Sequence, residues 1–288
     1  MGCLSPARRL GLSSLVLLAL LGGTALDARA AEQIAWFRDL KEASEAAQRA
    51  GLPMFIDFWA DWCAPCKVMD TQVYTNPAVV ETFRTRIVGV RVHYDLQRDL
   101  ARSFGVEALP YLVFTSSYGT PLLAHRGILA AGELVDVIKA MPSIAEINRL
   151  DRALQQDRNS FDDLVAMGRA LRAGGFYDAS LRHFERARRH RAARADPVSR
   201  EIVLYESALD AMDLKDGTRA AALLETCLRD FPSSARKPDL LLALGRAYAL
   251  DGLPARARRP LGLVISEYPE SAAAADARAL LQSLKPDR

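Results

Sequence analysis

The hydrophobic pattern of this sequence changes at Pro142, and this change limits the possible folds more than any other feature. Before it, short apolar runs alternate with stretches of helical spacing. Strands are predicted at residues 53–59, 87–92, 111–114 and 122–125. A helix is predicted from the apolar residues between Ile34 and Ala43, ending before Gly51. Strands interleaved with helices predict an α/β layer structure for residues 31–141.

After Pro142 the strand signals stop, and the chain is rich in Ala, Leu and Arg with helical spacing. Residues 142–160 are interpreted as a linker that is itself helical between Ile144 and Gln156. An all-α domain is predicted for residues 161–288.

Small and bulky residues recur at matched offsets in this second half. Three units share these offsets: Leu164, Met167, Gly168, Leu171, Ser180, Phe184 and Ala187; Leu204, Ala208, Ala211, Ala220, Leu224, Cys227 and Pro232; and Leu241, Leu244, Gly245, Tyr248, Ala257, Leu261 and Pro269. This recurrence predicts tetratricopeptide-like helical repeats, in which small residues let paired helices approach closely. The units are spaced more widely than the 34 residues of that repeat, so the connections must hold extra residues. A plain helical bundle rich in Ala and Leu is the alternative.

The first thirty residues have the pattern of a cleaved secretory signal peptide. Arg8 and Arg9 precede an apolar run at residues 10–21, and the segment ends in Ala28-Arg29-Ala30. The apolar run is short for a membrane span, which needs about 20 residues, although an uncleaved anchor is the alternative. We therefore expect export to an oxidising compartment.

The charge balance excludes a general affinity for nucleic acid. Residues 1–30 hold three of the 38 basic residues and one of the 35 acidic residues, so the rest of the chain carries 35 and 34. A chain this close to neutral has no overall field that would hold nucleic acid or acidic lipid. We expect no nucleic-acid partner.

Three cysteines remain after the predicted cleavage: Cys63, Cys66 and Cys227. The segment Trp62-Cys63-Ala64-Pro65-Cys66-Lys67 follows a predicted strand and opens a predicted helix. The unpaired N–H groups and the dipole at a helix start stabilise a thiolate over a thiol at Cys63. Disulfide exchange needs two sulfurs, and we expect the first of them to be exposed. The spacing therefore predicts a redox-active pair.

Two other interpretations of the pair stay open. A structural zinc site needs four ligands, and the histidines show no grouping that would complete one: His93, His125, His183 and His190. The second interpretation is an inert structural disulfide, although the aromatic residues before Cys63 and the presence of Pro65 match a redox motif better. We expect no metal and no cofactor. Cys227 occupies a small-residue position of a predicted repeat, which favours a buried, inert thiol.

Residues 53–67 resemble the active-site strand and helix of the thioredoxin family. Ala60-Asp61-Trp62-Cys63, together with Tyr74-Thr75-Asn76-Pro77-Ala78-Val79, is similar to the C-terminal thioredoxin-like domain of periplasmic thiol:disulfide interchange proteins. The resemblance covers about residues 32–141. It implies an α/β thioredoxin fold and a periplasmic location.

The resemblance also implies roles for individual residues. Cys63 would be the nucleophile and Cys66 the resolving thiol. Asp57 would be a buried proton acceptor beneath Cys66, with its pKa raised by desolvation; an acid without a catalytic role is the alternative. Pro110 would follow a cis bond and leave the Leu109 backbone free to pair with substrate. Trp62 would shape the rim.

Two departures from the family pattern bear on the chemistry. Ala64-Pro65 replaces the Gly-Pro of ordinary thioredoxins, so a reduction potential cannot be transferred. Arg91 stands where thioredoxins often have a buried Lys, and because it does not release its proton easily it would favour ionised Asp57 if the two are close.

The resulting expectation is a protein-disulfide reductase or exchange enzyme of the envelope, acting on disulfide-containing envelope proteins and recharged by a membrane electron donor. The same site could instead act as a dithiol oxidase or isomerase, because direction depends on potential. The predicted repeats could bind a protein partner, or could be the functional core of a scaffold with an accessory redox domain.

Overall fold

The computed structural model describes residues 33–284 of the chain. The predicted signal peptide at residues 1–30 and the last four residues of the predicted repeats lie outside this range. Within residues 33–284, no helix combines the length and the apolar character that crossing a bilayer requires.

A four-stranded mixed sheet organises the first half. Its strands are β1 (Met54–Trp59), β2 (Val88–His93), β3 (Tyr111–Thr115) and β4 (Pro121–Arg126), in the order β2-β1-β3-β4. β1 runs parallel to β2 and antiparallel to β3, and β4 runs antiparallel to β3. All four predicted strands are confirmed to within about two residues.

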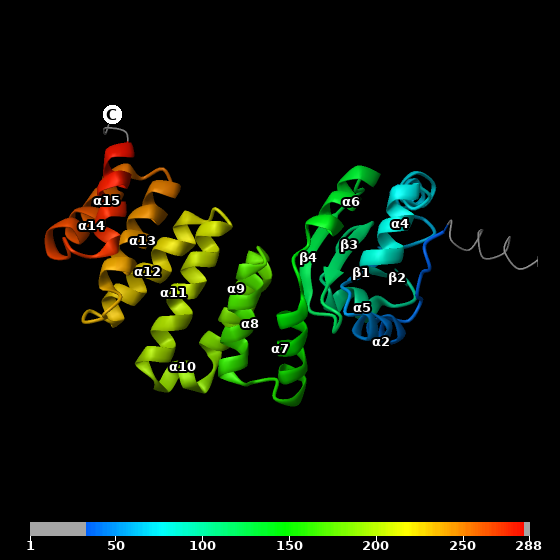
Figure 1. Cartoon of the computed structure of the whole chain (residues 1–288), viewed down its shortest axis with the longest axis horizontal. Coiled ribbons are helices and arrows are strands. Elements are labelled where there is room, and N and C mark those ends of the chain that lie inside the picture. Colours follow the sequence, from blue (N-terminus) through cyan, green and yellow to red (C-terminus); the bar gives the residue numbers. More distant parts are fainter. Residues whose placement is uncertain (1–32, 285–288) are drawn as a thin grey trace, which may run out of the picture.

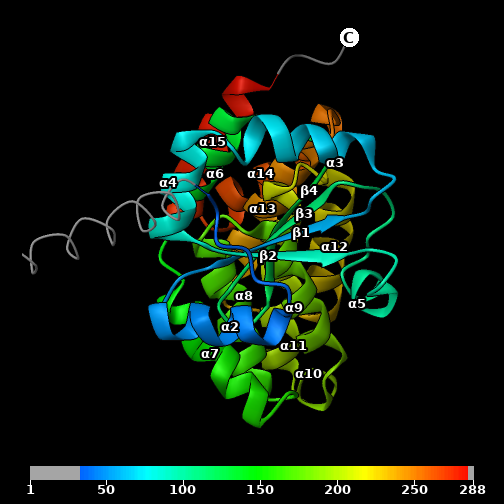
Figure 2. The same cartoon turned by 90° about the vertical axis from the view of Figure 1, so that its right-hand side faces the viewer.

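Helices cover both faces of this sheet, which confirms the predicted α/β layers (Figures 1 and 2). Helices α2 (Leu40–Ala50) and α5 (Arg98–Ser103) lie on one face. The other face is covered by α3 (Ala64–Val68), the π-helical turn η1 (Met69–Val73), α4 (Pro77–Arg86) and α6 (Ala131–Ala140).

The side chains of β1 alternate between the two faces. Met54, Ile56 and Phe58 pack with α2 and α5. Phe55 packs with η1, α4 and α6, so Asp57 points toward the layer that carries the cysteine helix.

The first predicted helix begins later than the sequence pattern indicates. Residues 34–37 are extended, and Phe37 forms a parallel bridge with Val90. The Phe37 N–H donates to the Gly89 carbonyl and the Phe37 carbonyl accepts from Arg91 N–H, both at 2.9 Å. The prediction of a helix from Ile34 is wrong, because the backbone of Phe37 forms hydrogen bonds with the edge strand β2 instead of helical ones. Helix α2 starts at Leu40, where the Asp39 carboxylate caps it by accepting from Glu42 N–H.

The segment after the first half is helical, as predicted: α7 spans Ala145–Gln156. Its polar face binds the turn between β3 and β4. Asp151 accepts from the Ser116 and Thr120 hydroxyls, both at 2.6 Å, and the Asn148 amide donates to the Ser117 hydroxyl at 2.9 Å. Ser116 and Ser117 are fully buried, so α7 is fixed against the sheet by satisfied polar contacts.

The remaining helices stack beside one another away from the sheet (Figure 1). They are α8 (Phe161–Ala173), α9 (Tyr177–Arg189), α10 (Arg191–Ala195), α11 (Pro197–Asp213), α12 (Gly217–Asp230), α13 (Lys237–Leu250), α14 (Pro254–Glu267) and α15 (Ala272–Ser283). The predicted all-α second half is confirmed. The short helix α10 holds extra residues between α9 and α11.

Close approach within the helix pairs explains the matched small and bulky residues. A Cβ atom added at Gly168 of α8 would lie 2.6 Å from the Phe184 ring of α9. A Cβ added at Gly245 of α13 would lie 2.5 Å from Leu261 of α14. Ala208 and Leu224 are fully buried in the same core as Leu261. The α8–α9 and α13–α14 pairs therefore each depend on a glycine opposite a bulky residue. Classification as tetratricopeptide repeats stays a prediction.

Candidate active site

The cysteine pair lies where β1 passes into α3. Cys63 is the N-cap of α3, and its Sγ accepts a hydrogen bond from the Cys66 N–H at 3.1 Å. Pro65 occupies the first helical turn, where its missing N–H costs little. The helix continues directly into the π-helical turn η1, a distortion often found at functional sites.

Cys63 and Cys66 form a disulfide, with Cα atoms 5.3 Å apart. Each residue is only 2 % exposed. The expectation that Cys63 is exposed is therefore wrong for this oxidised state. Both cysteines pack with Ala60, and Trp59, Tyr94 and Leu109 close over this small cluster.

Trp62 forms an exposed rim beside the disulfide. Its side chain is held although the residue is 65 % exposed: the indole Nε1 donates to Asp95 Oδ2 at 2.8 Å. Arg98 holds the other oxygen of Asp95 at 3.1 Å, and the ring meets Tyr94 edge to face. An aromatic side chain fixed at both its polar and apolar parts presents a preorganised contact surface.

The Leu109–Pro110 peptide bond is cis, as the resemblance predicts. Leu109 is half-buried beside the cysteines, whereas Pro110 is buried. The disulfide, Trp62 and the cis bond are thus brought to one end of the sheet. The pairing of the Leu109 backbone with substrate stays a prediction.

Asp57 lies in the sheet layer beneath the cysteine helix and is 1 % exposed. Burial raises the pKa of its carboxyl to about 6, and Arg91 and the Tyr74 hydroxyl oppose this rise. Arg91 Nε donates to Asp57 Oδ2 at 3.0 Å. Arg91 is therefore close enough to favour ionised Asp57, but burial outweighs the guanidinium and the pKa shift is upward, as the resemblance implies.

Three neighbouring residues were not singled out from the sequence. Asp70 forms an ion pair with Arg91, Tyr74 lies against the Asp57–Arg91 pair, and Asp95 anchors Trp62. Asp70 carries one available signal, because it follows Cys66 by one helical turn. Tyr74 stands in the segment that carries the resemblance, but nothing in the sequence indicates its contact with the Asp57–Arg91 pair. Asp95 carries no signal, since its contact with Trp62 joins residues distant in the chain.

His93, which was given no role, contacts the residues around the cysteines. Its Nε2 is 3.2 Å from Asp61 Oδ2, and its ring meets Trp59 edge to face. Cys227 is a free thiol and is buried, as predicted. Burial raises its pKa to about 12, which disfavours the reactive thiolate. Over residues 33–284, the structure places no three His, Cys, Asp or Glu side chains where they could hold a metal ion.

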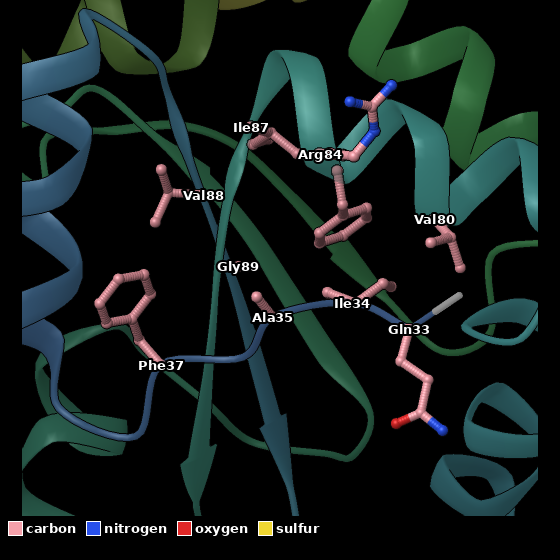
Figure 3. A pocket seen from close by; sticks show the side chains of 10 residues that line it. Gln33, Ile34, Ala35, Phe37, Val80, Arg84, Ile87, Val88 and Gly89 are labelled. Atoms are coloured by element: carbon pink, nitrogen blue, oxygen red, sulfur yellow. The ribbon is translucent and has the colours of Figure 1, made fainter. Parts of the chain in front are cut away.

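A cavity of about 260 Å³ lies between the extended segment at residues 33–37, strand β2 and helix α4 (Figure 3). Ile34, Val80, Ile87 and Gly89 are among the residues around it. Neither cysteine lines this cavity, so it is separate from the redox site.

Comparison with known proteins identifies the fold of the first half. Residues 35–122 match a family model described as thioredoxin-like. Thioredoxin 1 of Chlorobaculum tepidum is 44 % identical over 62 residues, which are 22 % of this chain and 58 % of that protein. Thioredoxin of Porphyra purpurea is 32 % identical over 92 residues, covering 32 % of this chain and 70 % of that protein.

A longer relative matches the same region. The thiol:disulfide interchange protein DsbD of Pasteurella multocida is 29 % identical over 99 residues, 33 % of this chain and 17 % of that protein. The chain thus spans little more than half of the first of these relatives and a small part of DsbD. Together with the cysteine pair, these matches identify the first half as a thioredoxin-like thiol–disulfide oxidoreductase domain.

Proposed function

This chain belongs to the thioredoxin family through its first half, and from that premise we propose that it reduces or exchanges disulfides in proteins of the bacterial envelope. The observation that carries the proposal is the Cys63–Cys66 disulfide at the start of α3, beside the cis Leu109–Pro110 bond and above buried Asp57.

The reaction is a pair of thiol–disulfide exchanges. In the reduced enzyme, the Cys63 thiolate attacks a substrate disulfide, forms a mixed disulfide and releases one substrate thiolate. Cys66 then passes its proton to Asp57 and attacks the Cys63 sulfur. This step forms the Cys63–Cys66 disulfide and releases the second substrate thiolate. Two electrons pass from the enzyme to the substrate.

Asp57 suits the second step because its pKa of about 6 lies near the working pH. Its position in β1 supports the role, since the carboxyl faces the layer that contains α3. The rim of Trp62 and the Leu109 backbone would hold the substrate segment while the exchange takes place.

Each turnover leaves the enzyme oxidised, so a donor must return two electrons. The proposed donor is a membrane protein that carries electrons to the envelope, as the similarity to part of a thiol:disulfide interchange protein suggests. A dithiol oxidase or isomerase would use the same residues in the opposite direction. Buried Asp57 and the thioredoxin-like motif favour reduction.

Export to the periplasm rests on the pattern of residues 1–30. Sequencing the N-terminus of the protein recovered from a periplasmic extract tests it, and we expect cleavage after Ala30. An intact Met1 terminus in a membrane fraction would instead indicate an anchor.

The second half is proposed to bind a protein partner through tetratricopeptide-like repeats. The matched close contacts at Gly168 and Gly245 support repeated helix pairs. Because α7 fixes these helices to the sheet, a bound partner would be held at high effective concentration near the redox domain. A scaffold with an accessory redox domain is the alternative.

A reduction assay tests the redox proposal directly. The chain without residues 1–30 should accelerate the reduction of insulin by dithiothreitol, and Cys63→Ser or Cys66→Ser should abolish the acceleration. Cys227→Ser is the matched control, because this thiol is inert, and it should retain full activity. Equal activity in Cys63→Ser would contradict the proposal. Cys66→Ala should in addition trap envelope proteins on Cys63 for identification.

A further inference from the structure

Arg91 connects the buried Asp57 with a carboxylate nearer the surface. Its Nε donates to Asp57 Oδ2 at 3.0 Å, and its Nη1 lies 2.9 Å from Asp70 Oδ1. The side chain of Arg91 is 10 % exposed, that of Asp57 is 2 % exposed and that of Asp70 is 33 % exposed. One guanidinium is therefore shared between two carboxylates at different depths.

Aromatic rings fix the guanidinium in this position. Its carbon lies 4.4 Å from the centroid of the Trp59 ring, 5.7 Å from that of Trp36 and 5.8 Å from that of Tyr74. Stacking on aromatic faces suits the planar charge of arginine, which does not release its proton. Arg91 therefore keeps its positive charge at this place. The carboxylates bound to its nitrogens determine how that charge is divided between them.

The cluster is not saturated with hydrogen bonds. Asp57 Oδ1, Asp70 Oδ1 and Arg91 Nη2 are buried and have no hydrogen-bond partner among the described residues, although Asp70 Oδ1 lies within ion-pair distance of Arg91 Nη1. Most buried polar atoms have one. Since unsatisfied polar groups are costly in a core that serves packing alone, this cluster calls for a functional explanation.

We propose that Asp70 is a positioning residue for the redox reaction: by sharing Arg91 with Asp57, it keeps Asp57 a strong enough base to take the proton of Cys66. This inference rests on the proposed role of Asp57 as the proton acceptor. With Asp70 present, Arg91 divides its charge between two carboxylates. Without Asp70, the whole charge would face Asp57 and hold it ionised, which would make it a weaker base.

The charged and titratable groups that face Asp57 come from two elements. Arg91 comes from β2, and Asp70 and Tyr74 come from η1 and its C-terminal end. From β3, the residue paired with Asp57 is the apolar Leu112. Within residues 33–284, Asp70 and Arg91 are thus the two charges whose removal should move the titration of Asp57, in opposite directions.

Carbon-13 NMR of the aspartate carboxyls in the oxidised chain tests the proposal, with Asp57→Asn to assign the signal. Asp70→Asn should lower the pKa of Asp57 by about one unit. Arg91→Met should raise it, and Arg91→Lys provides a second variant if Arg91→Met does not fold. Asp136→Asn on α6 removes an exposed charge from the same helical layer and should leave the titration unchanged.

Kinetics then separate this inference from the proposed function. Disulfide formation after Cys63 is loaded with a mixed disulfide should slow in Asp57→Asn, and its pH midpoint should move to lower pH in Asp70→Asn. Unchanged kinetics in Asp57→Asn would overturn the role of Asp57 and this inference with it. A slowed Asp57→Asn together with an unshifted Asp70→Asn would overturn only the inference.

Discussion

Two half-buried arginines, one in each half of the molecule, hold pairs of carboxylates in different ways. In the helical half, Arg172 of α8 binds Glu206 and Asp210 of α11, with Nε 2.6 Å from Asp210 Oδ1. The second oxygen of Asp210 accepts from Ser180 of α9 at 2.6 Å. No side-chain atom of this cluster is among the buried unpartnered atoms of the described residues. In the redox half, Arg91 and Asp57 each leave one such atom without a partner.

The difference indicates what each cluster does. A saturated network fixes three helices against one another, and breaking it leaves charges buried without partners. The unsaturated network of the redox half contains the carboxyl that we propose takes the proton of Cys66. On this proposal, the same residue types serve packing in one half and chemistry in the other.

The largest expected effect is on the rate of disulfide exchange, when a cysteine of the redox half is replaced rather than the cysteine of the helical half. Cys63→Ser removes the nucleophile, so disulfide exchange should fall by at least about 1000-fold. Cys227→Ser in the helical half should leave the rate unchanged, because burial keeps this sulfur a thiol. Stopped-flow measurement of exchange with a small aromatic disulfide compares the two, and a loss in Cys227→Ser would break the contrast.

Asp210→Ala should destabilise the chain by about 3–5 kcal/mol, since it removes one member of a buried ionic cluster and leaves Arg172 underpaired. Urea unfolding measures the change. Asp213→Ala, an exposed acid of the same helix, is the control and should change the free energy of unfolding by less than about 0.5 kcal/mol. Equal effects would show that the saturated network does not hold the helices.

Asp57→Asn should stabilise the folded chain, whereas Asp210→Ala should destabilise it. The pKa of Asp57 is about 6 in the folded chain against 3.8 for a free carboxyl, so the folded state binds more protons between these values. Stability therefore falls as the pH rises from about 4 to about 6 and is flat above, at a total cost of about 3 kcal/mol.

Removing this carboxyl should stabilise the chain by up to about 3 kcal/mol at pH 8, with the gain vanishing near pH 4. Unfolding of both proteins over this pH range measures it. A destabilised Asp57→Asn at pH 8 would indicate that Asp57, like Asp210, serves packing.

The smallest expected effects compare two glycines of the helical half. Gly168→Ala would press a methyl group into the Phe184 ring and should cost about 1–3 kcal/mol. Gly262 in α14 has open space around its Cβ position, so Gly262→Ala should stabilise the chain by about 0.5–1 kcal/mol. Thermal unfolding measures both, and a neutral Gly168→Ala would argue against close-packed repeated pairs.

Local patterns predicted much of the fold. Apolar runs bounded by Gly and Pro located all four strands, and the spacing of Cys63 and Cys66 located the disulfide at a helix start. The cis bond before Pro110 and the burial of Asp57 followed from the resemblance, which left the contact of Asp57 with Arg91 as a condition. Each of these depends on residues close in the chain or on a motif with a fixed geometry.

What depends on tertiary contacts was not predictable. Residues 34–37 have helical spacing but are extended, because they complete the edge of β2. Cys63 was expected to be exposed, whereas Tyr94 and Leu109 from distant elements cover it. Asp70 joins the Asp57–Arg91 pair only because β2 and η1 pack together, which no local pattern reports.

The reduction potential of the Cys63–Cys66 pair tests the central claim most directly. The chain without residues 1–30 would be equilibrated with dithiothreitol or glutathione buffers, and the fraction of disulfide measured by thiol labelling. The account predicts a two-electron transition near that of thioredoxin, about −270 mV. A value near that of the strong oxidants, about −120 mV, would contradict reduction and indicate a disulfide donor. Absence of any two-electron transition would contradict the redox assignment itself.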